Sequence, residues 1–284
     1  MIKDMLRLRR QMKQEEPLIH CITNPISIHD CANVILAAGG RPIMAEHPRE
    51  AAQITERAKA LMLNLGNITD VRMESMELSL KAAKEKEIPV LLDLVGTACS
   101  NLRLNYARHL LEIGGISILK GNMSELLAVT GKPSHSIGID AGWEDALNEQ
   151  NLPEILEDFR KLSRKTGTVI LASGREDLIL DEKEAYLVSN GVRMLSQITG
   201  TGCMLGAICT AYLAGKEPVA AALLGVTMMG IAGEFAAFEC RGPGSFQREL
   251  LDWLYTMEDR TLEKQSRIQR IFGTKGAEQC VIRN

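Results

Sequence analysis

Short runs of branched apolar residues alternate with longer helical patterns, and this alternation constrains the fold of the chain most. The runs show little polar alternation, which is typical of strands buried on both faces. The pattern therefore predicts an α/β fold with a mostly parallel central sheet flanked by helices. The expected strands are Leu18–Thr23, Pro42–Ala45, Ala60–Leu65, Pro89–Val95, Ile116–Lys120 and Thr168–Ala172, with a further pair at Leu178–Leu180 and Ala185–Val188.

The segments between these runs have the apolar spacing of helices. After about residue 190 the alternation ends, and three helices with no clear strand follow. The longest irregular stretch, residues 131–153, predicts a surface loop. The expected helices are Ile28–Ala38, Pro48–Lys59, Asp70–Lys86, Asn101–Ile113, Ser124–Val129 and Leu152–Lys165, and then Thr201–Ala214, Pro218–Glu239 and Gly244–Arg260.

A chain of 284 residues is about twice the typical domain size of roughly 150 residues. This length allows either two domains or one large α/β unit. No internal repeat, low-complexity block or linker divides the sequence. We therefore expect a single domain over residues 1–273 and a flexible C-terminal tail over residues 274–284.

Composition argues against several classes of protein. The 33 basic and 36 acidic residues leave no positive excess, so nucleic acid is not an expected partner. Seven cysteines without a C-x-x-C pair predict reduced thiols and a cytoplasmic location rather than a disulfide framework or a zinc site. Residues 1–16 lack the apolar core of a signal peptide. The apolar run Pro218–Gly233 is about four residues short of the roughly 20 that a membrane span needs, so it predicts a buried helix and no membrane.

The string Thr199-Gly200-Thr201-Gly202-Cys203 directly precedes a helix rich in small residues. Glycines allow the backbone to approach a ligand closely, and the helix N-terminus attracts negative charge. Such a turn stabilises a phosphoryl group during transfer. The alternative is an ordinary glycine-rich helix start with a buried structural cysteine.

Polar residues also follow two of the expected strands, where the ligand crevice of an open α/β sheet lies. Asp93 ends one apolar run, and Lys120, Asn122 and Glu125 follow another. In a functional site, Asp93 and Glu125 hold Mg²⁺ directly or through water, and Lys120 meets a phosphate. The structural alternatives are that Asp93 caps the next helix and that Asn122 and Glu125 form a capping box.

Three further strand ends carry groups compatible with a ligand. Ser173 ends a later strand and could hold a nucleotide phosphate, although an ordinary turn also explains it. Asn24 follows the first strand and could bond a small heterocycle, while Met44 follows the second and could pack on its face. No P-loop motif occurs, and no Rossmann glycine fingerprint follows the first strand. The combination predicts a small-molecule kinase without a P-loop.

Five stretches together resemble the hydroxyethylthiazole kinase family in order and spacing over residues 15–260. The most specific is Thr199-Gly200-Thr201-Gly202-Cys203, because most ribokinase-like relatives place Asp where this chain has Cys203. The other four are Thr23-Asn24-Pro25, Arg41-Pro42-Ile43-Met44-Ala45, Leu92-Asp93-Leu94-Val95-Gly96 and Lys120-Gly121-Asn122-Met123-Ser124-Glu125.

This resemblance implies a ribokinase-like fold and a homotrimer with active sites between subunits. It implies ATP- and Mg²⁺-dependent phosphorylation of the primary alcohol of 4-methyl-5-(2-hydroxyethyl)thiazole, for thiamine diphosphate synthesis by salvage. The implied roles are substrate binding by Met44, Gly200 and Asn24, ATP binding by Lys120, Ser173, Thr201 and Gly202, a metal site at Asp93 and Glu125, and Cys203 beside the acceptor hydroxyl.

The chain departs from the family pattern at three positions. The family usually has Arg at Lys120, so a bidentate phosphate contact becomes a point charge. It usually has Thr at Ser173 and Pro at Leu94. The rival interpretations are a hydroxymethylpyrimidine kinase, an ADP/ATP-dependent hydro-lyase acting on hydrated nicotinamide cofactors, and a nucleotide-binding sensor without catalysis. Cys203 in place of Asp argues against the first two.

Overall fold

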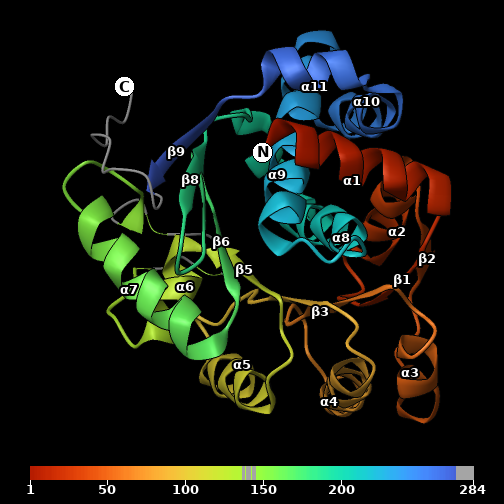
Figure 1. The fold of residues 1–284 in the computed structure, drawn as a ribbon, viewed down its shortest axis with the longest axis vertical. Helices are drawn as coiled ribbons and strands as arrows, with labels where there is room; N and C mark the ends of the chain where they lie inside the picture. Colours follow the sequence, from red (N-terminus) through yellow and green to blue (C-terminus); the bar gives the residue numbers. More distant parts are fainter. Residues whose placement is uncertain (136–137, 139–141, 143–144, 273–284) are drawn as a thin grey trace.

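One mixed sheet runs through the molecule, with helices on both of its faces (Figure 1). The computed structural model describes residues 1–135, 138, 142 and 145–272. The strands lie in the order β2-β1-β3-β4-β5-β6-β7-β8-β9, and β2 through β6 are parallel, whereas β7, β8 and β9 are antiparallel additions. Their bounds are β1 Leu18–Ile22, β2 Arg41–Ile43, β3 Ala60–Asn64, β4 Val90–Asp93, β5 Ile118–Asn122, β6 Val169–Ser173, β7 Asp177–Leu180, β8 Ala185–Val188 and β9 Ile268–Phe272.

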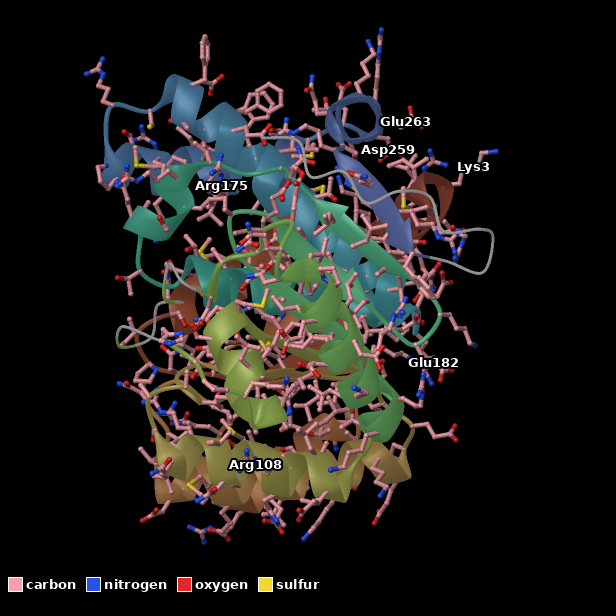
Figure 2. The ribbon with its side chains drawn as sticks, turned by 90° about the vertical axis from the view of Figure 1, so that its left-hand side faces the viewer. Lys3, Arg108, Arg175, Glu182, Asp259 and Glu263 are labelled. Atoms are coloured by element: carbon pink, nitrogen blue, oxygen red, sulfur yellow. The ribbon has the colours of Figure 1, made fainter. Side chains whose placement is uncertain are left out.

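The helices form two layers that enclose the sheet. Arg108 of α5 and Asp259 of α11 mark the two sides in Figure 2. One layer holds α3 Pro48–Thr55, α4 Asp70–Glu85, α5 Asn101–Ile113, α6 Met123–Thr130 and α7 Leu152–Thr166. The other holds α1 Ile2–Glu15, α2 Ile28–Ala38, α8 Thr201–Leu213, α9 Pro218–Glu239, α10 Pro243–Thr256 and α11 Asp259–Gln265, with a short 3₁₀ turn at Arg193–Gln197.

Alternation along the strands divides the core into two. Met62, Leu91 and Ile118 pack in the cluster that contains α8 and α9. Their chain neighbours pack in the second cluster, against α4 to α7. Because side chains two residues apart share a face of a strand, the residues Asn64, Asp93 and Lys120 fall on the α8 side at the carboxyl edge of the sheet. The alternation thereby directs three polar side chains toward one helix.

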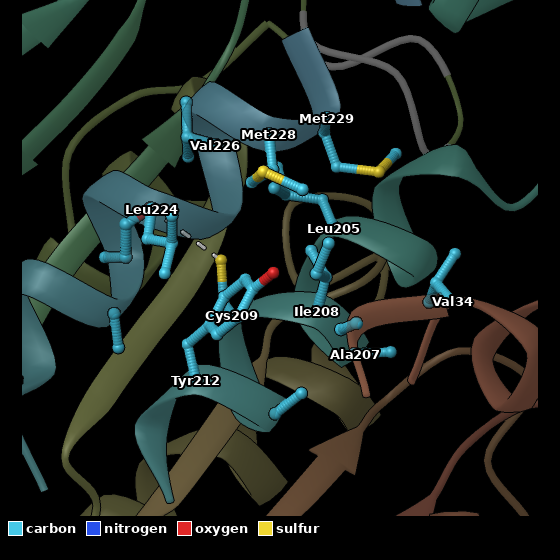
Figure 3. Close-up of a cluster of buried hydrophobic side chains, with 14 of the residues drawn as sticks. Val34, Leu205, Ala207, Ile208, Cys209, Tyr212, Leu224, Val226, Met228 and Met229 are labelled. Atoms are coloured by element: carbon cyan, nitrogen blue, oxygen red, sulfur yellow. Dashed lines mark hydrogen bonds between the residues drawn. The ribbon is translucent and has the colours of Figure 1, made fainter. Parts of the chain in front are cut away.

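Helices α8 and α9 pack closely at the centre of their layer (Figure 3). By length and composition α9 could cross a membrane, but 78% of its most apolar window is buried within the protein. The sequence prediction of a buried helix is confirmed. Residues such as Leu205 and Ile208 of α8 share one cluster with Leu224 and Met228 of α9.

The N-terminal helix α1, which was not predicted, is joined to the end of the chain by a buried arginine. Arg9 is 4% exposed. Its guanidinium donates to the Met257 carbonyl and forms an ion pair with Asp259. This contact therefore joins the two ends of the described chain within one helix layer.

The α/β architecture and the mostly parallel sheet agree with the sequence prediction. Three expectations near the ends of the chain were wrong or incomplete. Besides α1, the prediction missed strand β9, which pairs with β8 at one edge of the described sheet. The expected helix Gly244–Arg260 is two helices, α10 and α11. The predicted tail 274–284 and parts of the predicted loop 131–153 lie outside the described residues.

The close contact between α8 and α9 predicts that a methyl group at Gly225 destabilises the protein. A Cβ there would lie 2.4 Å from Cys209 Sγ and 3.1 Å from the Cys209 backbone nitrogen. We expect Gly225→Ala to lower the free energy of unfolding by about 1–3 kcal/mol, measured by urea denaturation. Gly244→Ala is the matched control, because no atom lies within 4 Å of its added Cβ. Equal stability of the two variants would contradict the close packing.

Candidate active site

The glycine turn before α8 adopts a conformation that requires glycine. Gly200 is the N-cap of α8, with φ +92°, in the left-handed region that L side chains rarely adopt. A Cβ there would also lie 3.1 Å from the Cβ of Ser27. Because Gly200 has no side chain to cap the helix, the first-turn N–H groups remain for a ligand or water. The turn therefore has the features of an anion site.

A buried ion pair lies beneath this first turn. Lys120 Nζ is 2.9 Å from both carboxylate oxygens of Asp93, and the two residues are 3% and 0% exposed. Glycines in α8 allow the helix to approach the pair. A Cβ at Gly202 would lie 3.8 Å from Lys120 Nζ, and one at Gly206 would lie 3.0 Å from Asp93 Oδ2. The structure thus brings Asp93, Lys120 and the glycine turn together.

Charge and burial oppose each other within the pair. Burial lowers the pKa of the Lys120 ammonium, but the nearby Asp93, Cys203 and Glu125 together outweigh burial and raise that pKa. Burial raises the pKa of Asp93, while Lys120 and an amide hydrogen bond from Asn64 act in the opposite direction. The ammonium is therefore a firmly held cation beneath the turn.

Two buried amides hold the thiol of Cys203. Asn24 Nδ2 and Asn64 Nδ2 each donate to Cys203 Sγ at 3.3 Å. The Asn64 amide also donates to Asp93 Oδ2 at 3.1 Å, and its oxygen accepts the N–H of Gly66 at 2.8 Å. The sequence analysis did not single out Asn64. The sequence feature that could have indicated Asn64 is a single amide at the end of an otherwise apolar run. It occupies the same position on its strand as Asp93 does.

Glu125 forms the capping box that was considered as the structural alternative. Its Oε2 accepts the Asn122 N–H at 2.8 Å, and the Asn122 side chain accepts the Glu125 N–H at 2.9 Å. The other carboxylate oxygen accepts the Gly96 N–H at 2.7 Å. Burial and the charge of Asp93 raise the pKa of Glu125, and these backbone donors lower it. The capping role does not separate Glu125 from the site, because the charge of Asp93 acts on it.

These contacts define what kind of metal binding the residues fit. All four carboxylate oxygens of Asp93 and Glu125 already accept hydrogen bonds. Within the described residues no group of three or more His, Cys, Asp or Glu side chains could hold a metal ion. Mg²⁺ usually keeps several waters and takes only one or two carboxylates. The Asp93 and Glu125 carboxylates therefore fit a hydrated Mg²⁺ that they contact through water better than a Mg²⁺ that they bind directly.

The remaining predicted residues lie at the same edge of the sheet. Ser173 ends β6 and its hydroxyl donates to the Gly121 carbonyl at 3.3 Å. Met44 follows the edge strand β2 and packs against the α8–α9 core. The Thr201 hydroxyl donates to the Leu195 carbonyl at 2.7 Å, so its side chain points back into the preceding loop.

In the order of the strands across the sheet, the site residues form a row along its carboxyl edge. Met44 follows β2, Asn24 follows β1, and Asn64 ends β3. Asp93 and Lys120 come next, on β4 and β5, and Ser173 ends the row on β6. Apolar and amide groups occupy one end of the row, charged and hydroxyl groups the other, and the α8 turn lies over the middle.

A model of the hydroxyethylthiazole kinase family matches residues 9–260 of the chain. The chain belongs to the hydroxyethylthiazole kinase family. It is 46% identical over 263 residues to hydroxyethylthiazole kinase 2 of Clostridium botulinum strain Hall, covering 93% of this chain and 99% of the relative. The family is one of phosphotransferases that act on an alcohol.

Solved structures agree with this assignment. A hydroxyethylthiazole kinase protein from Pyrococcus horikoshii OT3 superposes with a TM-score of 0.82 at 29% identity, covering 95% of this chain and 99% of that chain. A ribokinase-like superfamily protein from Enterococcus faecalis has a TM-score of 0.62 at 13% identity, covering 85% of this chain and 88% of that chain. The second likeness shows the fold alone, and it confirms the predicted ribokinase-like architecture.

Loss of the Lys120 ammonium should leave Asp93 as an unpaired buried charge. We expect Lys120→Met to lower the free energy of unfolding by about 3–5 kcal/mol at neutral pH. Without the ammonium, the folded-state pKa of Asp93 rises further above the unfolded value, so the deficit should shrink as the pH falls. Urea denaturation at several pH values measures both effects. The Asp93→Asn/Lys120→Met double variant should recover much of the loss, and equal instability of single and double variants would contradict the interpretation.

Proposed function

We propose that this protein transfers the γ-phosphoryl group of ATP to the primary alcohol of 4-methyl-5-(2-hydroxyethyl)thiazole. The product, a thiazole phosphate, then enters thiamine diphosphate synthesis by salvage. Membership of the hydroxyethylthiazole kinase family supports the reaction class. The observation that carries the proposal is the position of Cys203 in the first turn of α8, between two amides, one of which also donates to Asp93 of the Asp93–Lys120 pair.

The row of side chains suggests how two substrates share the site. The alcohol occupies the end with Met44, Asn24 and Gly200, where amide and apolar groups suit a heterocycle. The nucleotide occupies the other end, with Lys120 and Ser173 toward its phosphates. In that arrangement the Thr201 and Gly202 backbone N–H groups face the phosphoryl group, because they belong to the first turn of α8.

Charge stabilisation and positioning do most of the work in phosphoryl transfer. The acceptor oxygen forms a bond to the γ-phosphorus while the bond from that phosphorus to the ADP oxygen breaks. The hydroxyl proton goes to the thiolate form of Cys203, which becomes the thiol, or to solvent. Cys203 is therefore either a general base or a residue that only shapes the site. Mg²⁺, held through water near Asp93 and Glu125, would neutralise charge on the phosphates.

The remaining parts of the proposal concern domain organisation, assembly and location. We propose a single kinase domain over residues 1–273 that forms a cytoplasmic homotrimer with sites between subunits. One apolar side chain near the alcohol end of the row is well exposed: Ile26, two residues after Asn24, at 60%. Such a residue suits a subunit contact at that end, since a neighbouring chain would cover it.

A coupled assay of ADP release tests the proposal directly. With ATP, Mg²⁺ and the thiazole alcohol we expect ADP release that requires all three components. Omission of Mg²⁺ should abolish it, because the metal would neutralise charge on the ATP phosphates and the Lys120 ammonium is already engaged by Asp93. Binding of ATP with no ADP released above background would instead favour a nucleotide-binding sensor, which the engagement of Lys120 by Asp93 would suit.

Substitutions at Cys203 test the role of the thiol. We expect Cys203→Asp to retain or raise kcat, because the Asn24 and Asn64 amides are already placed to donate to a carboxylate. If Cys203 is the base, we expect Cys203→Ser to lower kcat by at least about tenfold, since a neutral hydroxyl is a weaker proton acceptor than a thiolate. Steady-state kinetics measures both variants. A faster Cys203→Asp enzyme shows that the thiol is not an optimised base, and a folded but inactive one contradicts the expectation.

A further inference from the structure

A buried arginine lies on the opposite face of the sheet from Cys203. Arg72 belongs to the first turn of α4, where the Thr69 hydroxyl accepts its backbone N–H. The residue is 4% exposed. Arg72 was not predicted to have a role, because a charged residue in a predicted helix usually lies at the surface.

The guanidinium of Arg72 contacts the loops that follow two neighbouring strands. Its Nη1 donates to the Thr23 carbonyl and to the Gly66 carbonyl, each at 3.2 Å. Its Nη2 donates to the Asn67 carbonyl. Thr23 directly precedes Asn24, and Gly66 donates its own N–H to the Asn64 side chain. One side chain therefore holds the backbone on both sides of the amide pair that contacts Cys203.

The same arginine also reaches the loop after β2. Its Nε lies 3.6 Å from Glu46 Oε2, and the Ser75 hydroxyl of the same helix donates to the Glu46 carbonyl at 2.6 Å. Glu46 is two residues beyond Met44. The three loops that Arg72 contacts thus carry Met44, Asn24 and the Asn64–Gly66 turn, which form one end of the row.

Only a guanidinium suits this position. Its planar group presents five donors in a fixed geometry, so it can bond several carbonyls that point from different directions. A lysine ammonium places all its donors on one atom and cannot span the same carbonyls. The contacts are also tight at Gly66, where an added Cβ would lie 2.8 Å from Asn24 Nδ2 and 2.9 Å from Asn64 Oδ1. A small shift of either loop would therefore move both amides.

We propose that Arg72 is the positioning residue that assembles the alcohol end of the site, by fixing three strand-end loops so that Asn24 and Asn64 meet Cys203. This inference rests on the proposed function for its kinetic consequence. Arg72 touches no reacting atom, and its contacts leave Lys120 and Ser173, at the nucleotide end, untouched. Its loss should therefore affect the two substrates unequally.

Kinetics of Arg72→Lys provide the first test. We expect KM for the thiazole alcohol to rise roughly 10–100-fold, because small displacements of positioning groups have effects of this size. KM for ATP should stay within about twofold of the parent value, since the nucleotide end keeps its contacts. An unchanged KM for the alcohol, or equal rises in both KM values, would overturn the proposal.

The matched control is Arg9→Lys. Arg9 is equally buried and also donates to a carbonyl, but it joins α1 to the residues at Met257 and Asp259. We expect it to reduce thermal stability while leaving both KM values unchanged. If Arg9→Lys raised KM for the alcohol as Arg72→Lys does, general loosening would explain the effect and the positioning role would be wrong.

Alkylation of Cys203 provides a readout that does not depend on turnover. Iodoacetamide labelling, resolved by peptide mass spectrometry, should be faster at Cys203 in Arg72→Lys than in the parent, because the two amides no longer hold the sulfur. Cys209, which is fully buried between α8 and α9, is the internal control and should not change. An unchanged rate at Cys203, or an equal rise at Cys209, would overturn the proposal. A parent enzyme without alcohol-dependent ADP release would remove the proposed function and leave this labelling test intact.

Discussion

The ion pair between Lys120 and Asp93 is the interaction on which the site depends. Asp93 is fully buried and Lys120 almost fully buried, so each charge is tolerable only because the other neutralises it. Their strands β4 and β5 are neighbours in register, with Asp93 paired directly with Lys120. The pair lies under the first turn of α8, which can approach because Gly202 and Gly206 have no side chain. The register of the sheet therefore forms the ion pair, and the glycines of α8 allow the helix to lie over it.

The position of the Asp93–Lys120 pair makes the two ends of the site chemically different. The positive end of the α8 dipole and the Lys120 ammonium point toward the same place, while Asp93 and Glu125 supply negative charge beside it. In the proposed reaction, an arriving polyphosphate would compete with Asp93 for the ammonium. Toward Met44 the charges give way to amides and apolar groups. A single edge of the sheet thus offers two chemically distinct ends, separated by Cys203.

The sequence predicted those parts of the molecule whose signal is local. The apolar runs identified eight of the strands, and the glycines around Thr201 indicated the helix start that the structure contains. Strand β9 was missed because its five residues have no regular apolar alternation, and a short edge strand depends on its partner β8 for its conformation. Helix α1 was missed because its frequent charges mask the apolar spacing of Met5, Leu8 and Met12.

Within the site, the residues that were missed act through contacts distant in sequence. Asn64 is one amide in an apolar run, and only the fold shows that it lies between Asp93 and Cys203. In the sequence, Arg72 has the pattern of a solvent-exposed helix residue. In the structure its guanidinium donates to the carbonyls of Thr23, Gly66 and Asn67. The capping box of Glu125 was anticipated as an alternative, because its signal lies within four residues.

The contact between α1 and the C-terminal segment has a consequence for biosynthesis. The partners Arg9 and Asp259 are 250 residues apart in the chain, so at translation rates of about 5–20 residues per second the helix waits roughly 10–50 s for its partner to emerge from the ribosome. During that interval the apolar side of α1, with Met5, Leu8 and Met12, has no completed layer to cover it. Helices α8 and α9 of this layer are also made late, so much of that face of the nascent sheet remains uncovered until residues 201–239 are made. Nascent chains of this protein are therefore suited to protection by a chaperone that binds apolar helices.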